Sequence, residues 1–170
     1  YTLSLHDALP ISLVSCPVVL IDRLTQCGWC DAVGFDNYLG GRLAAQYLLE
    51  GGHTRIGIVT GDIAESSAAE RRRGFVDAIE QSGKHFDSSL CVEGDYRFDS
   101  GYRAANQIID GGATAVFCCN DVMALGFRQR MAERGLHVTE DMQVIGYDNI
   151  LKRFGLGWRM TTVEQSVTDL

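Results

Sequence analysis

Carboxylate and amide side chains follow short apolar runs at several points in the sequence. The residues at these run ends are Asp22, Asp62, Asn120, Asp121 and Asp148. Such groups can bind a polar ligand, transfer protons or hold Mg²⁺. In an open α/β sheet, ligands bind beyond the carboxyl ends of the parallel strands. If the apolar runs are strands of one parallel sheet, these polar residues share one ligand-binding edge.

The motifs of common enzyme classes are missing from this chain. It has no G-x-S-x-G, no phosphate-binding loop, no H-E-x-x-H and no complete G-x-G-x-x-G. The four histidines do not follow any of the apolar runs. We therefore expect a binding protein that is not an enzyme, with no cofactor and no resident metal.

The cysteines offer a competing interpretation. Cys27-Gly-Trp-Cys30 has the spacing of a redox or zinc pair, but a structural zinc site needs two further ligands. Cys118 and Cys119 are adjacent, so in a strand they point to opposite faces and cannot supply those ligands together. We expect ordinary, reduced cysteines.

Length and charge limit the classes of function. A chain of 170 residues can bury one core or two small ones. The net charge of −7 argues against binding nucleic acid through this chain's own surface, and Arg71-Arg72-Arg73 is the only basic cluster. No apolar run approaches the roughly 18–20 residues that cross a bilayer, so we expect no membrane partner.

Apolar periodicity predicts alternating strands and helices. The expected strands are Pro17–Ile21, Ala32–Phe35, Ile56–Val59, Cys91–Val92, Ala115–Cys119, Gln143–Tyr147 and Thr161–Val163. The expected helices are Leu39–Leu49, Glu70–Gln81, Asp99–Asp110 and Val122–Arg134. This alternation predicts an α/β fold with parallel sheets and right-handed crossovers.

Polar residues at the helix starts predict helix caps. Asn37 is placed to cap the 39–49 helix, and Asp121 is placed to cap the helix that follows it. Residues 61–69 should form a polar loop. The side chains expected to face the core from the 39–49 helix are Leu39, Leu43, Tyr47 and Leu48.

Several segments, in their order and spacing, resemble the effector-binding core of the LacI/GalR family of bacterial transcription regulators. They are residues 17–23, 35–41, 47–53, 55–58, 70–75, 120–126, 144–149 and 161–165. Each motif alone is weakly specific, but their common register from Pro17 to Leu170 is strong. The resemblance implies the type I fold of periplasmic sugar-binding proteins, in which two doubly wound, parallel α/β subdomains enclose the ligand.

The resemblance also implies a domain organisation. Residues 13–36 correspond to part of an N-terminal subdomain, and residues 37–165 to a nearly complete C-terminal, effector-binding subdomain. Residues 166–170 would begin the return to the first subdomain. We expect Tyr1–Ser12 to be a non-native leader. Alternatively, Leu13–Cys16 resembles a lipoprotein cleavage box, which would make Tyr1–Ser15 a signal peptide.

By resemblance, the effector ligands correspond to particular residues. They are Asp22, Arg71, Asn120 and Asp148, with Tyr96 covering a face of a sugar ring and Ser67 and Gln165 as further contacts. Carboxylates, guanidinium groups and amides match the hydroxyls of a polyol. A purely structural role remains open for each residue. In particular, Arg72 or Arg73 could replace Arg71 as the inward-facing arginine.

The implied function is that of a cytoplasmic sensor. A small sugar-like effector would close two subdomains and shift the population of homodimer states. A helix-turn-helix outside this sequence would bind operator DNA. The alternative is a periplasmic sugar-binding protein for transport or chemotaxis, and an α/β enzyme is the weaker third reading.

Overall fold

The computed structural model of the protein describes residues 17–21, 30–153 and 159–165. The expectations for the leader, the lipoprotein-like box, Asp22 and residues 166–170 lie outside these ranges. The chain divides between Gly34 and Phe35 into two compact units. The interpretation of these units as two subdomains stays a prediction.

The first unit contains two short parallel strands, β1 (Val19–Ile21) and β2 (Asp31–Val33). Leu20 pairs with Ala32 at the centre of this ladder. The second strand ends at Val33, so it is shorter than the predicted one, which ran to Phe35.

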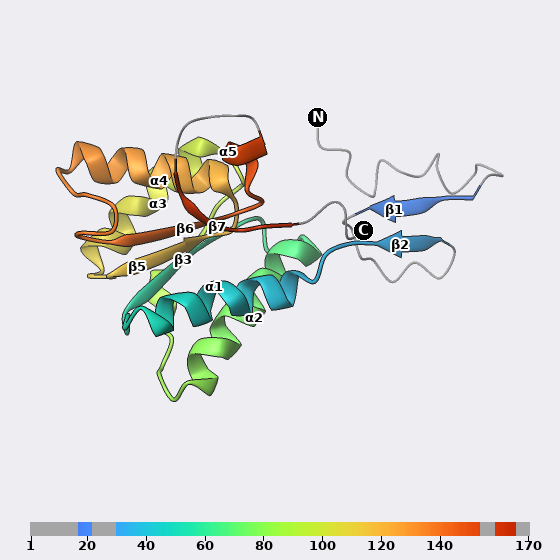
Figure 1. Ribbon diagram of the computed structural model, residues 1–170, viewed down its shortest axis with the longest axis horizontal. Helices are drawn as coiled ribbons and strands as arrows, with labels where there is room; N and C mark the ends of the chain where they lie inside the picture. The colour runs from blue at the N-terminus through green and yellow to red at the C-terminus, as the bar shows by residue number, and fades with distance from the viewer. Residues whose placement is uncertain (1–16, 22–29, 154–158, 166–170) are drawn as a thin grey trace. The chain divides into compact units, whose positions relative to one another are not determined.

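The second unit is built on a five-stranded parallel sheet (Figure 1). Its strands are β3 (Ile56–Thr60), β4 (Cys91–Glu93), β5 (Ala115–Cys118), β6 (Gln143–Tyr147) and β7 (Thr161–Val163). Their spatial order is β4-β3-β5-β6-β7. Every residue of β3 and β5 is buried, which explains why these strands read as continuous apolar runs.

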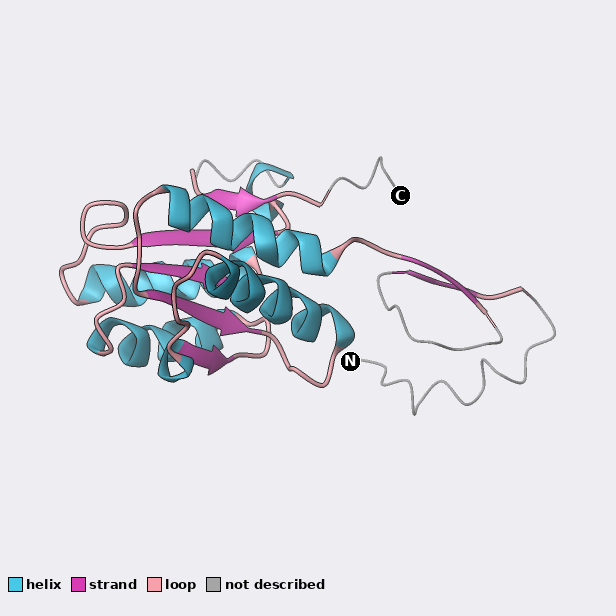
Figure 2. Ribbon diagram, turned by 90° about the horizontal axis from the view of Figure 1, so that it is seen from below, coloured by secondary structure: helices cyan, strands magenta, loops and turns pink. Residues whose placement is uncertain are grey.

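Helices cover both faces of this sheet. They are α1 (Asn37–Glu50), α2 (Ser66–Gln81), α3 (Phe98–Asp110), α4 (Asp121–Glu133) and the short α5 (Ile150–Arg153), with the 3₁₀ helix η3 at Ser88–Leu90. The pair α1 and α2 lies on one face, and the pair α3 and α4 lies on the other (Figures 1 and 2). The expected fold class, a doubly wound parallel α/β sheet, is therefore confirmed.

An aromatic row connects α2 to the centre of the sheet. Phe75 of α2 stacks on Phe117 of β5, with ring centroids 5.4 Å apart. Phe117 in turn lies 6.2 Å from the ring of Tyr147 at the end of β6. All three rings are buried, so α2 is fixed firmly over the carboxyl ends of β5 and β6.

The predicted core face of α1 is wrong. Leu39, Leu43 and Tyr47 are each nearly half exposed, and only Leu48 of the expected set is buried. The helix packs on α2 through small residues instead. A Cβ on Gly41 would lie 2.0 Å from the carbonyl oxygen of Arg71, so the two helices approach more closely than leucine side chains allow.

Two helix starts also differ from expectation. Asp36, not Asn37, caps α1, and its carboxylate accepts a hydrogen bond from the backbone N–H of Leu39 at 2.7 Å. The second helix begins at Ser66 rather than Glu70, which shortens the predicted loop. The alanines of this extra turn have high helix propensity, and Ala68 is buried.

The cysteines are in two states. Cys91, Cys118 and Cys119 are free thiols, and the last two are fully buried. Cys30 is disulfide-bonded, so the expectation of reduced cysteines is wrong for this residue. Within the described ranges, no helix is long and apolar enough to cross a membrane.

Candidate functional site

The strand order creates a switch point at the carboxyl ends of β3 and β5. The chain leaves β3 to form β4 on one side and returns to form β5 on the other side. The connecting segments therefore diverge above the sheet between β3 and β5, and ligands of open α/β sheets bind at this place. The predicted polar residues gather around this point.

Arg71 is the inward-facing arginine of its triplet, as the resemblance implied. Its side chain is buried, whereas Arg72 and Arg73 are exposed. The reason is helical periodicity, because Arg71 shares one face of α2 with the buried Ala68 and Phe75.

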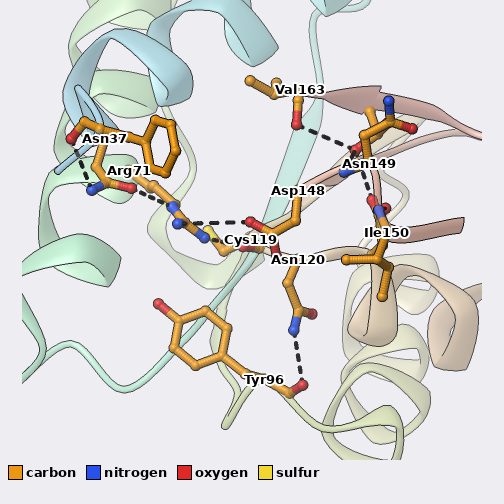
Figure 3. A network of polar contacts seen from close by, with 12 residues as sticks. Asn37, Arg71, Tyr96, Cys119, Asn120, Asp148, Asn149, Ile150 and Val163 are labelled. Atoms are coloured by element: carbon orange, nitrogen blue, oxygen red, sulfur yellow. Dashed lines mark hydrogen bonds and ion pairs between the residues drawn. The ribbon is translucent and has the colours of Figure 1, made fainter. Parts of the chain in front are cut away.

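Three elements hold the guanidinium of Arg71 in place (Figure 3). Nε donates to Oδ1 of Asn37 at 2.8 Å, and Nη1 donates to the carbonyl oxygen of Cys119 at 2.6 Å. The guanidinium also lies 3.8 Å from the centroid of the Tyr147 ring, within the range of a cation–π contact. Asn37 and Tyr147 were not predicted as site residues. Their only signal was their position inside the motifs that contain Asp36 and Asp148.

Asp148 faces the remaining side of this guanidinium. Its Oδ1 lies 4.0 Å from Nη2 of Arg71, an ion-pair distance that is too long for a direct hydrogen bond. Gln165 lies between them. In the amide orientation that satisfies both neighbours, it accepts from Arg71 Nη2 and donates to Asp148 Oδ1, each at 3.3 Å. Burial raises the pKa of Tyr147 beneath this group, and the positive charge of Arg71 opposes the rise.

Tyr96 lies across the end of β3. A Cβ on Gly61 would come within 2.1 Å of the Tyr96 ring, so glycine is required for this close approach. The Tyr96 hydroxyl is buried and makes no hydrogen bond within the described residues. Burial raises the pKa of Tyr96, and the neighbouring Ser67 hydroxyl opposes the rise. Ser67 and Tyr96, which are distant in sequence, are thus neighbours at the site.

The predicted division of roles between Asn120 and Asp121 is wrong in one respect. Asn120 is the cap of α4, because its Oδ1 accepts from the backbone N–H of Met123 at 2.8 Å. Its Nδ2 donates to the carbonyl oxygen of Tyr96 at 2.9 Å. Asp121 is not the cap. The extended backbone of Asn120 directs its side chain to the helix start, so Asn120 takes the capping position. The carboxylate of Asp121 instead accepts from the hydroxyl of Thr162 and from the backbone N–H of Ile150.

The site therefore combines six of the seven predicted ligand residues at one edge of the sheet. They are Arg71, Asn120, Asp148, Tyr96, Ser67 and Gln165, and Asp22 lies outside the described residues. Their assignment as effector ligands stays a prediction. The arrangement offers a guanidinium, a carboxylate, amides, hydroxyls and an aromatic ring. In the described part of the chain, no three His, Cys, Asp or Glu side chains are grouped to hold a metal ion.

Comparison with known proteins gives a consistent result. The family model of the periplasmic binding protein-like domain matches residues 45–170. The HTH-type transcriptional repressor PurR of Pasteurella multocida (strain Pm70) is 37% identical over 161 residues, which cover 94% of this chain and 48% of the repressor. PurR of Vibrio atlanticus (strain LGP32) is 36% identical over 151 residues, which cover 88% and 45%. The chain spans about half the length of these relatives.

Solved structures agree with these sequence matches. A LacI family transcriptional regulator from Enterococcus faecium, solved with bound ribose, superposes with a TM-score of 0.87 at 28% identity. The match covers 99% of this chain and 63% of that one. The Escherichia coli transcriptional repressor ascG superposes with a TM-score of 0.80 at 27% identity, with coverages of 94% and 59%.

These matches define the class of the protein. The chain belongs to the family of periplasmic binding protein-like domains. Within that family it is an effector-binding core of the LacI type, and the resemblance seen in its sequence motifs is confirmed.

Proposed function

We propose that the protein senses a small, polar, sugar-like effector at the carboxyl edge of its five-stranded sheet. The observation that carries this proposal is the buried guanidinium of Arg71 beside Asp148. The two groups are 4.0 Å apart, and the side chain of Asp148 is 30% exposed. A ligand hydroxyl that displaces the Gln165 amide from this position can accept from the guanidinium and donate to the carboxylate, so it would bridge both groups.

The aromatic side of the site supports the same ligand class. The buried Tyr96 hydroxyl lacks a partner within the described residues, and leaving such a group unsatisfied is unfavourable. A ligand hydroxyl would supply the missing hydrogen bond. The Tyr96 ring would cover the apolar face of a sugar, because aromatic rings combine an apolar body with a polar tip.

Two structural relatives add support. The Enterococcus faecium regulator was solved with bound ribose. A CelR–cellobiose complex superposes on 93% of this chain with a TM-score of 0.77 at 26% identity. Sugars are therefore the first ligands to test, and purines serve as the chemically distinct comparison.

The regulatory output extends beyond this chain. The relatives are HTH-type transcriptional repressors. By analogy, we propose that this protein acts in the cytoplasm and that a helix-turn-helix outside this sequence binds operator DNA. The effector would shift the population of homodimer states, and Asp22 stays a predicted further ligand. This function needs neither an enzymatic step nor a cofactor. The names of the relatives favour a regulator over a periplasmic transport protein.

Calorimetric titration of the full-length protein tests the proposal. The panel is ribose, glucose, cellobiose, hypoxanthine and guanine. We expect saturable binding of at least one sugar and a measurable change in operator affinity in its presence. Binding of a purine alone would contradict the sugar-like ligand class. If no compound of the panel binds, the proposed function is contradicted.

A further inference from the structure

Asp121 is a buried carboxylate that joins two distant segments. It is fully buried at the start of α4. Its Oδ1 accepts from the hydroxyl of Thr162 on β7 at 2.7 Å, and its Oδ2 accepts from the backbone N–H of Ile150 at 2.8 Å. A Cβ on Gly146 would lie 2.2 Å from Oδ1. The end of β6 therefore carries glycine where the carboxylate needs room.

The segment held by Asp121 has an unusual backbone. Asp148 and Asn149 are consecutive residues with positive φ, 95° and 55°. Non-glycine residues adopt such angles at an energetic cost, and they persist only where surrounding contacts determine them. The Asp148–Asn149 turn therefore depends on external hydrogen bonds.

Each N–H of this turn has an acceptor (Figure 3). The N–H of Asp148 donates to the carbonyl oxygen of Val163 at 2.9 Å. The N–H of Asn149 faces Oγ1 of Thr162 at 3.4 Å, and the N–H of Ile150 donates to Asp121. Asp121 thus contacts the turn directly through Ile150 and indirectly through Thr162.

We propose that Asp121 is a positioning residue of the effector site. Through Ile150 it fixes the strained turn that presents the Asp148 carboxylate to Arg71. Through Thr162 it fixes β7, whose chain continues to Gln165. One buried carboxylate therefore sets the positions of two candidate ligands from different elements, without touching the effector itself. The expected effect of Asp121 on effector affinity rests on the proposed function. Its expected effect on the Asp148–Asn149 turn does not.

Three substitutions separate positioning from general stability. Asp121→Ala removes both hydrogen bonds. Thr162→Val removes only the hydroxyl and keeps the shape of the side chain. Asp121→Asn is the conservative variant, because its amide oxygen can still accept from Ile150 while its NH₂ donates to a rotated Thr162 hydroxyl. The matched controls are Thr161→Val, on the exposed neighbour in β7, and Glu80→Gln, on an exposed carboxylate of α2.

The first readout is amide hydrogen exchange of residues 148–150 in the full-length protein without effector. We expect exchange to accelerate about tenfold or more in Asp121→Ala and Thr162→Val. Asp121→Asn should restore most of the protection, and both controls should match the wild type. Unchanged exchange in Thr162→Val and Asp121→Ala, with both proteins folded by circular dichroism, would overturn the proposal. If Asp121→Ala does not fold, Thr162→Val decides through the exchange of Asp148 and Ile150, whose N–H groups do not donate to Thr162.

The second readout is the Kd for ribose, or for the tightest-binding sugar of the panel if ribose does not bind. We expect Thr162→Val to weaken binding at least about fivefold, Asp121→Ala to weaken it more, and Asp121→Asn to recover part of the loss. Faster exchange with an unchanged Kd would overturn the link between the turn and the site. If the wild type binds no compound of the panel, the proposed function fails, and the exchange result alone then decides whether Asp121 fixes the turn.

Discussion

The guanidinium of Arg71 lies 3.8 Å from the centroid of the Tyr147 ring, and both residues are buried beneath the same edge of the sheet. Helix α2 supplies the cation, and β6 supplies the ring. Because Asn37 and the carbonyl oxygen of Cys119 take two of its donor groups, Arg71 is held in one orientation before any ligand arrives. Such preorganisation reduces the loss of side-chain conformational entropy on ligand binding.

The orientation of Arg71 predicts a clear difference between two neighbouring arginines. Arg71→Lys removes the planar group that stacks on Tyr147 and donates in two directions, which a lysine cannot replace. We expect the Kd of the best-binding sugar to rise about 10- to 100-fold, since a hydrogen bond to a charged group contributes roughly 1.5–3 kcal/mol. Arg72→Lys, on the exposed side of α2, is the control and should bind within twofold of wild type in calorimetry. Equal effects of the two substitutions would contradict the assignment.

The Tyr96 hydroxyl, which has no hydrogen bond within the described part of the chain, predicts opposite effects on stability and affinity. Tyr96→Phe removes a buried polar atom that has no hydrogen bond within the described residues, so the melting temperature should stay the same or rise. Sugar affinity should fall about fivefold, the equivalent of roughly 1 kcal/mol for one hydrogen bond. Thermal unfolding and calorimetry measure the two effects. Tyr102→Phe, whose hydroxyl donates to Glu133 on the surface, should leave affinity unchanged. A less stable Tyr96→Phe protein with full affinity would refute this role.

The close contact of α1 with α2 predicts where α1 tolerates substitution. Gly41→Ala would place a methyl group 2.0 Å from the carbonyl oxygen of Arg71. Forcing the helices apart should lower the free energy of unfolding by about 1–3 kcal/mol. Leu43→Ala removes more atoms but from a side chain that is 48% exposed, so it should cost less than about 1 kcal/mol. Urea unfolding of both variants checks the order, and a larger loss in Leu43→Ala would contradict this packing.

The buried thiols predict a dependence of stability on pH. Burial raises the pKa of Cys119 to about 12, and burial raises the pKa of Cys118 well above its usual range. In the unfolded chain these thiols ionise near pH 8.5, so above that pH the unfolded state binds fewer protons than the folded state. The free energy of unfolding should therefore fall as pH rises from about 9 toward 12, by up to about 1.4 kcal/mol per pH unit for each thiol.

Urea unfolding at about pH 8, 9 and 10 measures this slope. Cys119→Ala should be less stable at neutral pH but should lose stability less steeply than wild type as pH rises. Thr161→Val, an exposed change that involves no ionisable group, is the control and should keep the wild-type slope. Identical slopes in all three proteins would show that Cys119 does not stay protonated in the fold.

The sequence predicted the architecture well because the parallel strands of this sheet are buried on both faces. The runs at residues 56–59, 115–119 and 144–147 are continuously apolar, and each ends within one residue of an observed strand end. The same logic placed the polar residues at one edge. The resemblance favoured Arg71 but left Arg72 and Arg73 open, and the structure decides because Arg71 shares the buried face of α2 with Phe75.

Packing by small residues was harder to predict. The leucines of α1 suggested a core face, but Gly41 packs on α2, Gly40 packs on Tyr147, and Leu39 and Leu43 stay exposed. The roles of Asn120 and Asp121 were assigned incorrectly for a related reason. Either side chain can accept the N–H of a helix start, and the choice depends on Thr162 and Ile150, which are distant in sequence.

The most direct test of the account is a double-mutant cycle on the two charges of the site. Calorimetry of the full-length protein would compare wild type, Arg71→Ala, Asp148→Ala and the double variant against the best-binding sugar. If both residues bind one bridging ligand group, each single variant should lose at least about tenfold in affinity, and the double loss should fall short of the sum by more than about 0.5 kcal/mol. Wild-type affinity in both single variants would show that the effector binds elsewhere.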